Sequence, residues 1–425
     1  MININKIETL VGNHVAPYMY NSVNFKPGET VIPYSGPYWD NREIEAAVNT
    51  FLNGTWISAG EEVRAFENAF SERFNVRHSL MVNSGSSANL LMISALKKYL
   101  NWQDGDEVIV SSVGFPTTVS VLHQNNLKPV FVDIEWDTLN FDLNKIDEKA
   151  TARTKAIFLS PVLGNPPDMS TLIEYSELLG IELILDNCDS LGSKWGGQYL
   201  NEYAIASSCS FYAAHHLCTG EGGMVSTDDK GLMDIMLSMA HWGRACNCIG
   251  SVNLSLKGAC EKRFSKWLDC YDGVVDHKYV FDNMGYNLKP LDLQGAIGQV
   301  QIEKFTEIAA KRKHSKAVIE EIVCRIPGVR GVNSLPQSDV CWFGTPFICE
   351  DGLKHKLVSH LEKNLIQTRN YFTGNILMHA GYSFMDDYRN YPEANKVLDK
   401  VFFIGCAPHY SEEIFSYIKE VIKKF

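Results

Sequence analysis

The sequence predicts an α/β protein with a mostly parallel central sheet. Short apolar runs at 107–112, 129–134, 155–162 and 181–187 alternate with helical segments. Because these runs are apolar throughout, we expect strands that are buried on both faces, with helices as the crossover connections. Ligands bind such sheets at the carboxyl ends of the strands. With 425 residues, 45% of them apolar, the chain can bury one large core and a smaller second one.

The residues before these runs favour helices. Residues 39–75 carry apolar side chains at helical spacing, acidic first turns and one internal glycine stop, which predicts two amphipathic helices. A third helix is expected at 86–101. Residues 1–30 form a polar N-terminal arm in this interpretation, and 31–243 form the large domain.

After residue 187 the pattern changes twice. Two more candidate strands with a loop occur at 208–216 and 222–227. Residues 244–282 contain cysteines, basic residues and aromatics with little periodicity, so we interpret them as a functional insertion. A smaller C-terminal α/β domain is expected at 283–425, with helices at 290–324, 352–364 and 411–425 and strands at 342–350 and 366–372.

Charge and composition exclude several classes of protein. The net charge of −11 and the pI near 5.6 argue against a nucleic-acid partner, which needs a concentrated basic surface. No apolar run reaches the roughly 18–20 residues of a membrane helix, and the first residues lack a secretory signal. We therefore expect a cytoplasmic protein whose 11 cysteines are packing residues, reactive thiols or metal ligands rather than disulfides.

Three segments carry residues suited to a phosphorylated ring cofactor. Gly85 and Ser86 precede a helix, whose free N–H groups can hold a phosphate. Asp186 ends an apolar strand, where a carboxylate can pair with a protonated ring nitrogen. Ser210 offers another hydroxyl, and His215 a group for proton transfer. Each segment alone also fits a structural role as a turn, a helix cap or a packed histidine.

In this order, the segments resemble the sugar aminotransferase family of the aspartate aminotransferase fold, which includes the enzymes of DegT and StrS type. The resemblance covers about residues 30–425. It implies a PLP-dependent transferase of fold type I, with 31–243 as the cofactor-binding domain. The family motif SFHxxK ends in the lysine that binds pyridoxal phosphate, and aligning it with SFYAAH places His215 at that lysine. Covalent anchoring of the cofactor is then lost.

The resemblance also implies roles for the neighbouring residues. Gly85, Ser86 and Ser210 would bind the phosphate, Phe115 would stack on the ring, and Asp186 would pair with the ring nitrogen.

Further residues take their expected roles from the same resemblance. Asn287 would reach a neighbouring subunit's phosphate, which implies a homodimer. Asp189 replaces the family's usual glutamine, and with Tyr212 it would flank the cofactor or orient His215. Arg369 is a candidate for binding the nucleotide diphosphate.

Histidine in place of lysine changes the expected reaction. Imidazole can move protons but cannot form the resting imine. The cofactor would therefore act as pyridoxamine phosphate, which condenses with a 4-keto sugar; His215 removes a proton from its C4′ carbon and the C3 hydroxyl leaves. Two known 3-dehydrase subgroups have histidine here. One uses glutamate and no metal, and the other uses a [2Fe–2S] cluster and a flavin-containing reductase.

The cysteine spacing favours the second subgroup. In the iron–sulfur dehydrases, the cluster ligands have a characteristic spacing, which this sequence resembles. Here 57 residues separate Cys188 from Cys246, one residue separates Cys246 from Cys248, and Cys260 would be the fourth ligand. The last interval, eleven residues, is longer than in those relatives, and Cys270 competes for the fourth place. The remaining cysteines are expected to pack in the interior: Cys209, Cys218, Cys324, Cys341, Cys349 and Cys406.

The resemblance points first to CDP-4-keto-6-deoxyglucose as substrate, in the biosynthesis of 3,6-dideoxyhexoses of lipopolysaccharide. A dTDP-linked sugar is also compatible. Three hypotheses stay open: the iron–sulfur 3-dehydrase; a metal-free 3-dehydratase of a GDP- or dTDP-linked sugar, or an aminotransferase; and a cofactor-binding regulator. The regulator would need a DNA-binding segment, and the sequence shows none.

Overall fold

The computed structural model describes residues 25–54, 57–246 and 263–425. The expected N-terminal arm, 1–30, therefore lies mostly outside the described residues. Within the described ranges, no helix is both long enough and apolar enough to cross a membrane.

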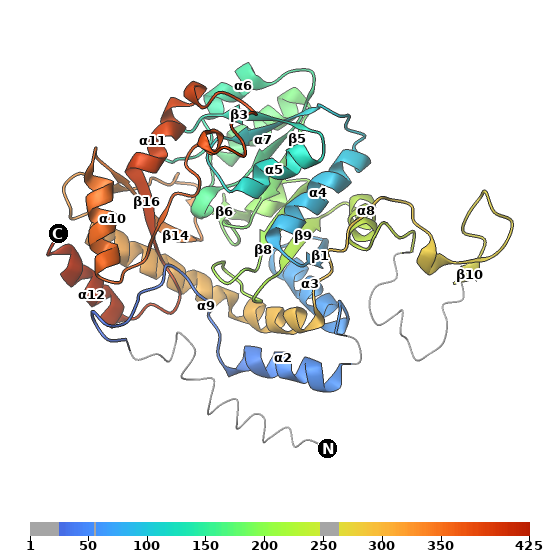
Figure 1. Cartoon of the computed structure of the whole chain (residues 1–425), viewed down its shortest axis with the longest axis horizontal. Coiled ribbons are helices and arrows are strands. Elements are labelled where there is room, and N and C mark those ends of the chain that lie inside the picture. Colours follow the sequence, from blue (N-terminus) through green and yellow to red (C-terminus); the bar gives the residue numbers. More distant parts are fainter. Residues whose placement is uncertain (1–24, 55–56, 247–262) are drawn as a thin grey trace.

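A seven-stranded sheet forms the centre of the larger part of the chain (Figure 1). Strand β9 runs antiparallel to both of its neighbours, and the other neighbouring strands pair in parallel. The mostly parallel sheet predicted from the sequence is confirmed. In spatial order the strands are β1 (His78–Val82), β9 (Gly223–Thr227), β8 (Ala206–Ser210), β5 (Glu182–Asp186), β4 (Thr154–Leu159), β2 (Glu107–Ser111) and β3 (Lys128–Val132).

The strand predictions hold best where the runs are most apolar. The four predicted runs between 107 and 187 correspond to β2, β3, β4 and β5, although some of their ends are displaced. Strand β1 was not predicted. The candidate strand at 208–216 is too long, because β8 ends at Ser210 and the chain then turns, with the His215 N–H donating to the Tyr212 carbonyl at 2.9 Å.

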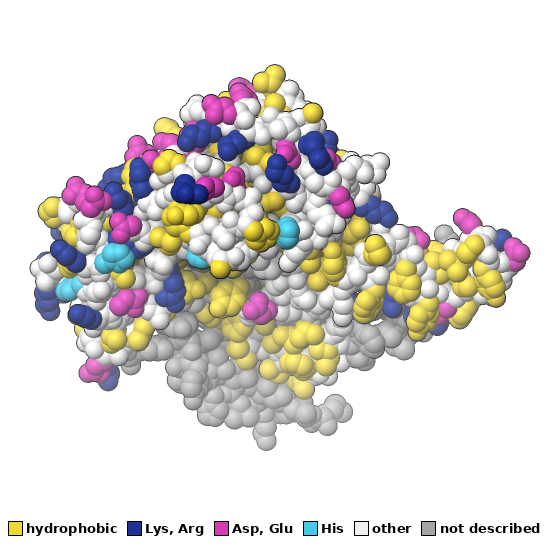
Figure 2. Space-filling view, turned by 45° about the horizontal axis from the view of Figure 1, so that its top comes forward, with side chains coloured by type: hydrophobic (Ala, Val, Ile, Leu, Met, Phe, Trp, Pro, Cys, Tyr) yellow, Lys and Arg dark blue, Asp and Glu magenta, His cyan; other side chains and the backbone are white. Residues whose placement is uncertain are grey.

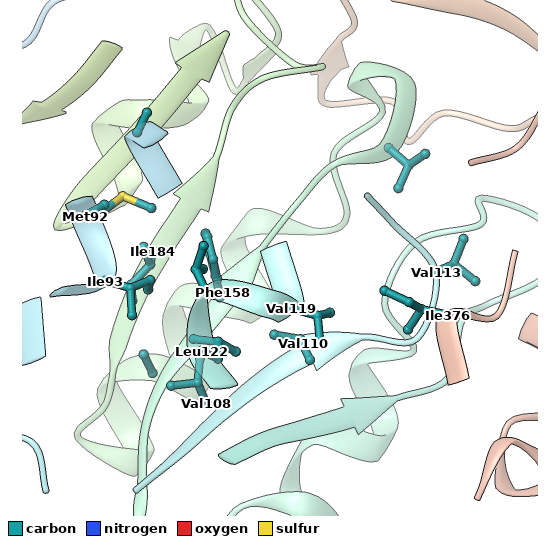
Figure 3. Close-up of a cluster of buried hydrophobic side chains, with 14 of the residues drawn as sticks. Met92, Ile93, Val108, Val110, Val113, Val119, Leu122, Phe158, Ile184 and Ile376 are labelled. Carbon is teal, nitrogen blue, oxygen red and sulfur yellow. The ribbon is translucent and has the colours of Figure 1, made fainter. Parts of the chain in front are cut away.

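Alternating side chains of the strands fill two cores, one on each face of the sheet. Val108 and Val110 of β2 pack in one core, and Ile109 between them packs in the other. Figure 3 shows the first core, where Val108 and Val110 lie with Phe158 and Ile184. These four side chains are fully buried, as expected for strands that are apolar on both faces.

Helices cover the sheet and complete these cores. Helix α4 (Gly85–Tyr99) begins at the N-cap Ser84, whose side chain accepts from the Ser87 N–H. The capping box of Asp40 and Glu43 begins α2. The other helices of this part are α2 (Asn41–Asn53), α3 (Glu61–Arg73), α5 (Pro116–Gln124), α6 (Ile146–Lys149), α7 (Met169–Leu179) and α8 (Lys230–Ala240).

Helix α9 (Asp292–Val323) connects the larger part to a smaller α/β unit. Its Phe305 packs in a core with β8 and β9, and its Ile319 in the core of the smaller unit. The smaller unit has an antiparallel sheet in the order β12 (Val329–Gly331), β14 (Gly344–Cys349), β16 (Val401–Gly405) and β15 (Thr368–Asn370), with helices α10 (Leu353–Lys363), α11 (Pro392–Lys400) and α12 (Glu412–Ile422).

Short elements complete the fold. A three-stranded sheet joins β13 (Ser338–Asp339), β6 (Lys194–Trp195) and β7 (Gln198–Tyr199). Single 3₁₀ turns lie at Leu143–Lys145, Val162–Gly164, Leu200–Tyr203, His277–Tyr279, Ile376–Met378 and Tyr388–Asn390.

The described part of the expected insertion projects from the body of the molecule (Figure 1). It contains the short antiparallel pair β10 (Phe264–Ser265) and β11 (Val275–Asp276). Arg263 and Asp276 form an ion pair beside this pair of strands, at 2.7 Å.

Candidate active site

A cavity of about 570 Å³ lies where β5 and β8 end, at the carboxyl edge of the sheet. Its volume is in the range of known small-molecule sites. Side chains of the smaller unit close its other side. The cavity brings together many of the residues predicted from the sequence: Gly85, Ser86, Phe115, Asp186, Cys188, Asp189, Ser210, Tyr212, His215 and Arg369.

The first part of the site is the start of α4, which meets the end of β8. A Cβ atom on Gly85 would lie 2.5 Å from the Cβ of Ser210 and 3.0 Å from the Sγ of Cys188, so only glycine fits there. The hydroxyls of Ser84, Ser86 and Ser210 line the cavity beside the helix N-terminus. Backbone N–H groups and hydroxyls at a helix start suit a phosphate.

The second part is the buried carboxylate of Asp186, which is surrounded by donors. One of its oxygens accepts from Thr118 Oγ1 at 2.7 Å and from Asn89 Nδ2 at 2.8 Å. The other accepts from the Cys188 N–H at 3.2 Å. Ser208 Oγ donates to Asn89 Oδ1 at 2.6 Å and thereby fixes the amide. This network holds the carboxylate in one orientation at the cavity wall.

The third part is the pair of His215 and Asp189. His215 Nδ1 lies 3.8 Å from Asp189 Oδ1 and has no hydrogen bond among the described residues. Burial and, to a smaller extent, the Arg312 charge lower the pKa of His215 to about 4, although a hydrogen bond with the Cys188 backbone opposes the shift. Burial raises the pKa of Asp189 to about 8, with a contribution from Asp186. At neutral pH the imidazole is therefore free to accept a proton, and Asp189 can donate a hydrogen bond.

Aromatic side chains form the remaining walls. The ring of Phe343 packs on His215, with ring centroids 5.1 Å apart, and Tyr212 approaches the imidazole from another side at 6.5 Å. Phe115 is about half exposed and meets Phe372 edge to face at 6.0 Å. An exposed ring at the cavity wall can pack against a planar ligand.

Arg369 supplies a positive charge to the cavity. Its guanidinium lies over the Tyr34 ring at 4.0 Å and donates to the Thr368 carbonyl at 2.7 Å. No carboxylate of the described residues forms an ion pair with it. An arginine in this state can bind an anionic group of a ligand.

Asn287 does not line the cavity of its own chain. It is exposed, pairs with His241 as an isolated bridge and accepts a hydrogen bond from Lys289. Lys289 in turn lies over the ring of Trp242 at 3.3 Å. The expected contact of Asn287 with a partner's phosphate stays a prediction.

Two of the four predicted cluster ligands can be placed. Cys188 lines the cavity, where burial raises the pKa of its thiol well above the ordinary value, and Cys246 is half-buried. Cys248 and Cys260 lie outside the described residues. Within the described ranges, no three metal-ligating side chains come together. Cys270 is exposed.

The other cysteines behave as packing residues, as predicted. Cys324 is half-buried, and the rest are buried: Cys209, Cys218, Cys341, Cys349 and Cys406.

Several residues of the site were missed from the sequence. Asn89 and Thr118 hold Asp186, and Tyr34 and Phe343 form walls from distant parts of the chain. Ser84 lay in the predicted phosphate segment but was not singled out. Only this serine had a local signal, since it precedes a glycine at a helix start.

The donor set fits a phosphorylated pyridine cofactor. The cavity has a tight helix start with hydroxyls, an exposed aromatic ring and an oriented carboxylate, and these groups match a phosphate, a ring face and a ring nitrogen. No lysine is among the described residues that line it. The cavity can therefore bind such a cofactor and move a proton through His215, but it offers no side-chain amine for an imine.

Comparison with known proteins identifies related sequences along nearly the whole chain. The family profile described as the DegT/DnrJ/EryC1/StrS aminotransferase family matches residues 39–423. A protein of Saccharopolyspora spinosa named dTDP-4-dehydro-2,6-dideoxy-D-glucose 3-dehydratase is 36% identical, over 95% of this chain and 88% of the relative. The lipopolysaccharide biosynthesis protein RfbH of Salmonella typhimurium is 33% identical, over 99% of this chain and 98% of the relative.

Solved structures agree with this comparison. The E. coli GDP-4-keto-6-deoxy-D-mannose-3-dehydratase with bound hydrated PLP is similar with a TM-score of 0.81 and 28% identity, covering 93% of this chain and 100% of that one. The predicted fold, that of the PLP-dependent transferases, is confirmed.

Proposed function

The chain belongs to the DegT/DnrJ/EryC1/StrS aminotransferase family, and we propose that it removes the C3 hydroxyl of a nucleotide-linked 4-keto-6-deoxyhexose with pyridoxamine phosphate as cofactor. The observation that carries this proposal is His215 at the cavity wall, where aminotransferases of the family carry a lysine. A histidine there can transfer protons but cannot hold an aldehyde covalently.

When bound in the cavity, pyridoxamine phosphate would supply an amine for the C4 ketone and a ring that can take up electron density. Gly85, Ser86 and Ser210 bind its phosphate in this proposal. Asp186 pairs with the ring nitrogen and keeps it protonated, and Phe115 packs on the ring face.

His215 performs the proton transfer. Its imidazole is neutral at physiological pH, because burial lowers its pKa to about 4, so it can accept the C4′ proton directly. The protonated His215 imidazole can then donate this proton to the C3 hydroxyl, which leaves as water. Asp189, with its raised pKa, and Tyr212 flank the imidazole and orient it. Arg369 binds the diphosphate of the substrate.

The finer proposal adds a [2Fe–2S] cluster and a separate flavin-containing reductase that supplies single electrons. Cys188, Cys246, Cys248 and Cys260 would hold the cluster. The spacing of these four cysteines supports this, and so does the free Cys188 thiol at the cavity wall. Metal binding would displace the thiol proton that burial otherwise retains. Such thiols stay reduced in the cytoplasm, where we place the protein.

A homodimer completes this proposal. Asn287 is exposed outside the cavity of its own chain, as a residue that serves a neighbouring subunit would be. Apolar side chains also gather on the projecting segment at the right of Figure 2, among them the exposed Phe264, Tyr271 and Val274. Exposed apolar patches of this kind favour a protein interface.

One experiment separates the candidate reactions. The protein is purified without oxygen, iron, sulfide and the visible spectrum are measured, and the protein is incubated with pyridoxamine phosphate, a flavin reductase and CDP-4-keto-6-deoxyglucose. Iron and sulfide in equal amounts with 3-deoxygenated product support the proposal. Transfer of an amino group to the sugar would contradict it.

Two alternatives are tested by the same assay. The relative from Saccharopolyspora spinosa is named for a dTDP-linked substrate, so the dTDP-linked sugar is the second nucleotide to use. The similar E. coli structure is of a GDP-linked sugar 3-dehydratase. Turnover of a GDP-linked or dTDP-linked sugar by iron-free protein, with glutamate and without reductase, would favour the metal-free reaction.

A further inference from the structure

A buried arginine lies directly behind the proposed proton-transfer histidine. Arg312 comes from the middle of α9, and its side chain is 1% exposed. No acidic side chain among the described residues forms an ion pair with it. Because an arginine stays charged in the interior, burying it without a carboxylate is unfavourable, and its hydrogen bonds offset only part of this. Such a residue needs an explanation beyond packing.

The guanidinium donates hydrogen bonds to two separate segments of the cavity wall. One terminal nitrogen, Nη2, donates to the carbonyls of Ala214 at 3.2 Å and His215 at 3.0 Å. The other, Nη1, donates to the Phe343 carbonyl at 3.1 Å. Ser35 Oγ adds a second donor to the Ala214 carbonyl, at 2.7 Å. Arg312 therefore connects the loop after β8 to the segment before β14.

These two pieces are the ones that confine the imidazole. The backbone of His215 determines where its side chain starts, and the ring of Phe343 packs on one face of the imidazole at 5.1 Å. A single planar group fixes both, and it does so with charge-assisted hydrogen bonds, which are stronger than neutral ones. The planar fork of arginine reaches several acceptors at once, whereas the lysine ammonium is a compact point charge.

We propose that Arg312 is a positioning residue, which aims the His215 imidazole at the reacting carbon by tying the His215 carbonyl to the Phe343 backbone. This proposal rests on the proposed role of His215. Arg312 is not among the residues that line the cavity. Its loss is therefore expected to affect the proton-transfer step and to leave binding intact.

The test compares Arg312→Met and Arg312→Lys with the wild type. Lys311→Met is the matched control, because Lys311 immediately precedes Arg312 on α9, is exposed and pairs with Glu307 at 3.4 Å. Folding is followed by thermal melting and cofactor binding by absorbance titration with pyridoxal phosphate. Proton transfer is followed by tritium release from C4′-labelled pyridoxamine phosphate, with the sugar nucleotide that the wild type turns over.

We expect Arg312→Met to bind the cofactor within about twofold of the wild type, with an unchanged KM and a kcat lowered on the order of 100-fold, as displaced catalytic groups typically show. Arg312→Lys should lose less, about tenfold, because it keeps one charge-assisted bond. Lys311→Met should equal the wild type. If Arg312→Met fails to fold, Arg312→Lys carries the comparison. A folded variant with wild-type kcat would overturn the proposal.

A double variant separates positioning from general damage. Adding Arg312→Lys to His215→Asn should cause no further loss of kcat, since a residue that acts only through His215 has nothing left to position. An additional loss would contradict the proposal. Full turnover by His215→Asn alone would instead refute the proposed function. A crystal structure of cofactor-loaded Arg312→Lys adds a readout without turnover. If the His215 imidazole keeps its wild-type position relative to Phe343 and Asp189, the positioning role is also overturned.

Discussion

Asn89 donates its side-chain amide to the carboxylate of Asp186 at 2.8 Å, across the interface between α4 and the end of β5. The same amide accepts from Ser208 Oγ at 2.6 Å, so its orientation is fixed. The orientation of the carboxylate that is proposed to pair with the cofactor ring thus depends on Asn89, three positions after Ser86 on the same helix.

Asn89→Ala is expected to weaken binding of pyridoxal phosphate about tenfold, because a hydrogen bond to a charged group contributes roughly 1.5–3 kcal/mol. The dissociation constant from an absorbance titration checks this. Ser94→Ala is the control, since Ser94 lies on the same helix but bonds to Asn125 and Tyr286. Equal affinities in all three proteins would show that the Asn89 contact does not orient Asp186.

Gly85→Ala tests the phosphate cradle. The added methyl group would lie 2.5 Å from the Ser210 Cβ, so the helix start must move away from β8. We expect affinity for pyridoxal phosphate to fall at least tenfold, with little change in that for pyridoxal, which has no phosphate. Gly114→Ala is the matched control, because a Cβ there meets nothing within 4 Å. An equal loss for both cofactors would argue against a phosphate at Gly85.

His215→Asn separates cofactor binding from proton transfer. The amide can occupy the space of the imidazole but cannot accept a proton at neutral pH, so we expect retained cofactor affinity and a loss of C4′ proton removal of 10²-fold or more. Tritium release from labelled pyridoxamine phosphate measures the step. His216→Asn is not a suitable control, since His216 is buried and its Nε2 donates to the Cys341 carbonyl in the core at 2.9 Å. Unchanged turnover would refute the role of His215.

Much of this site could be predicted because its key residues follow strands or precede helices. Asp186 ends an apolar run, and His215 follows a recognisable motif. Arg312 could not be found in this way, because it lies 97 residues beyond His215 on a long helix and only folding brings the two together. The same applies to Phe343, which reaches the cavity from the smaller unit. Strand β1 was missed because its first two residues are polar.

Glu67 predicts a pH dependence of stability that is unrelated to catalysis. It is buried on α3 and accepts one hydrogen bond, from the Met81 N–H at 2.7 Å, and burial raises its pKa to about 8 from an ordinary 4.5. Between these values the folded state holds a proton that the unfolded state releases. The free energy of unfolding therefore falls as pH rises from 4.5 to 8.

Glu67→Gln keeps the acceptor and removes this slope. The variant should match the wild type near pH 4.5 and exceed it at pH 8 by a few kcal/mol, at about 1.4 kcal/mol per pKa unit. Urea unfolding at both values measures the difference. Glu72→Gln, exposed on the same helix, should leave the slope unchanged. Parallel pH profiles for Glu67→Gln and the wild type would contradict the prediction.

The last prediction concerns the choice between Cys260 and Cys270 as the fourth cluster ligand. Cys270 is exposed on the projecting segment, between Lys266 and Asp272, which form an ion pair at 3.1 Å. A cluster ligand must meet Cys188 at the cavity wall, whereas Cys270 lies on the segment that projects from the body of the molecule (Figure 1). We therefore expect Cys270→Ser, purified without oxygen, to retain its iron and visible spectrum.

Cys260→Ser should lose most of its iron under the same conditions, because three thiolates leave one cluster position open. Cys246→Ser should behave like Cys260→Ser and should still remove the C4′ proton, since His215 and the cofactor site are untouched. Iron, sulfide and tritium release are measured on each protein. Iron lost from Cys270→Ser but kept in Cys260→Ser would reverse the assignment, and iron unchanged in all three would exclude a cluster at these cysteines.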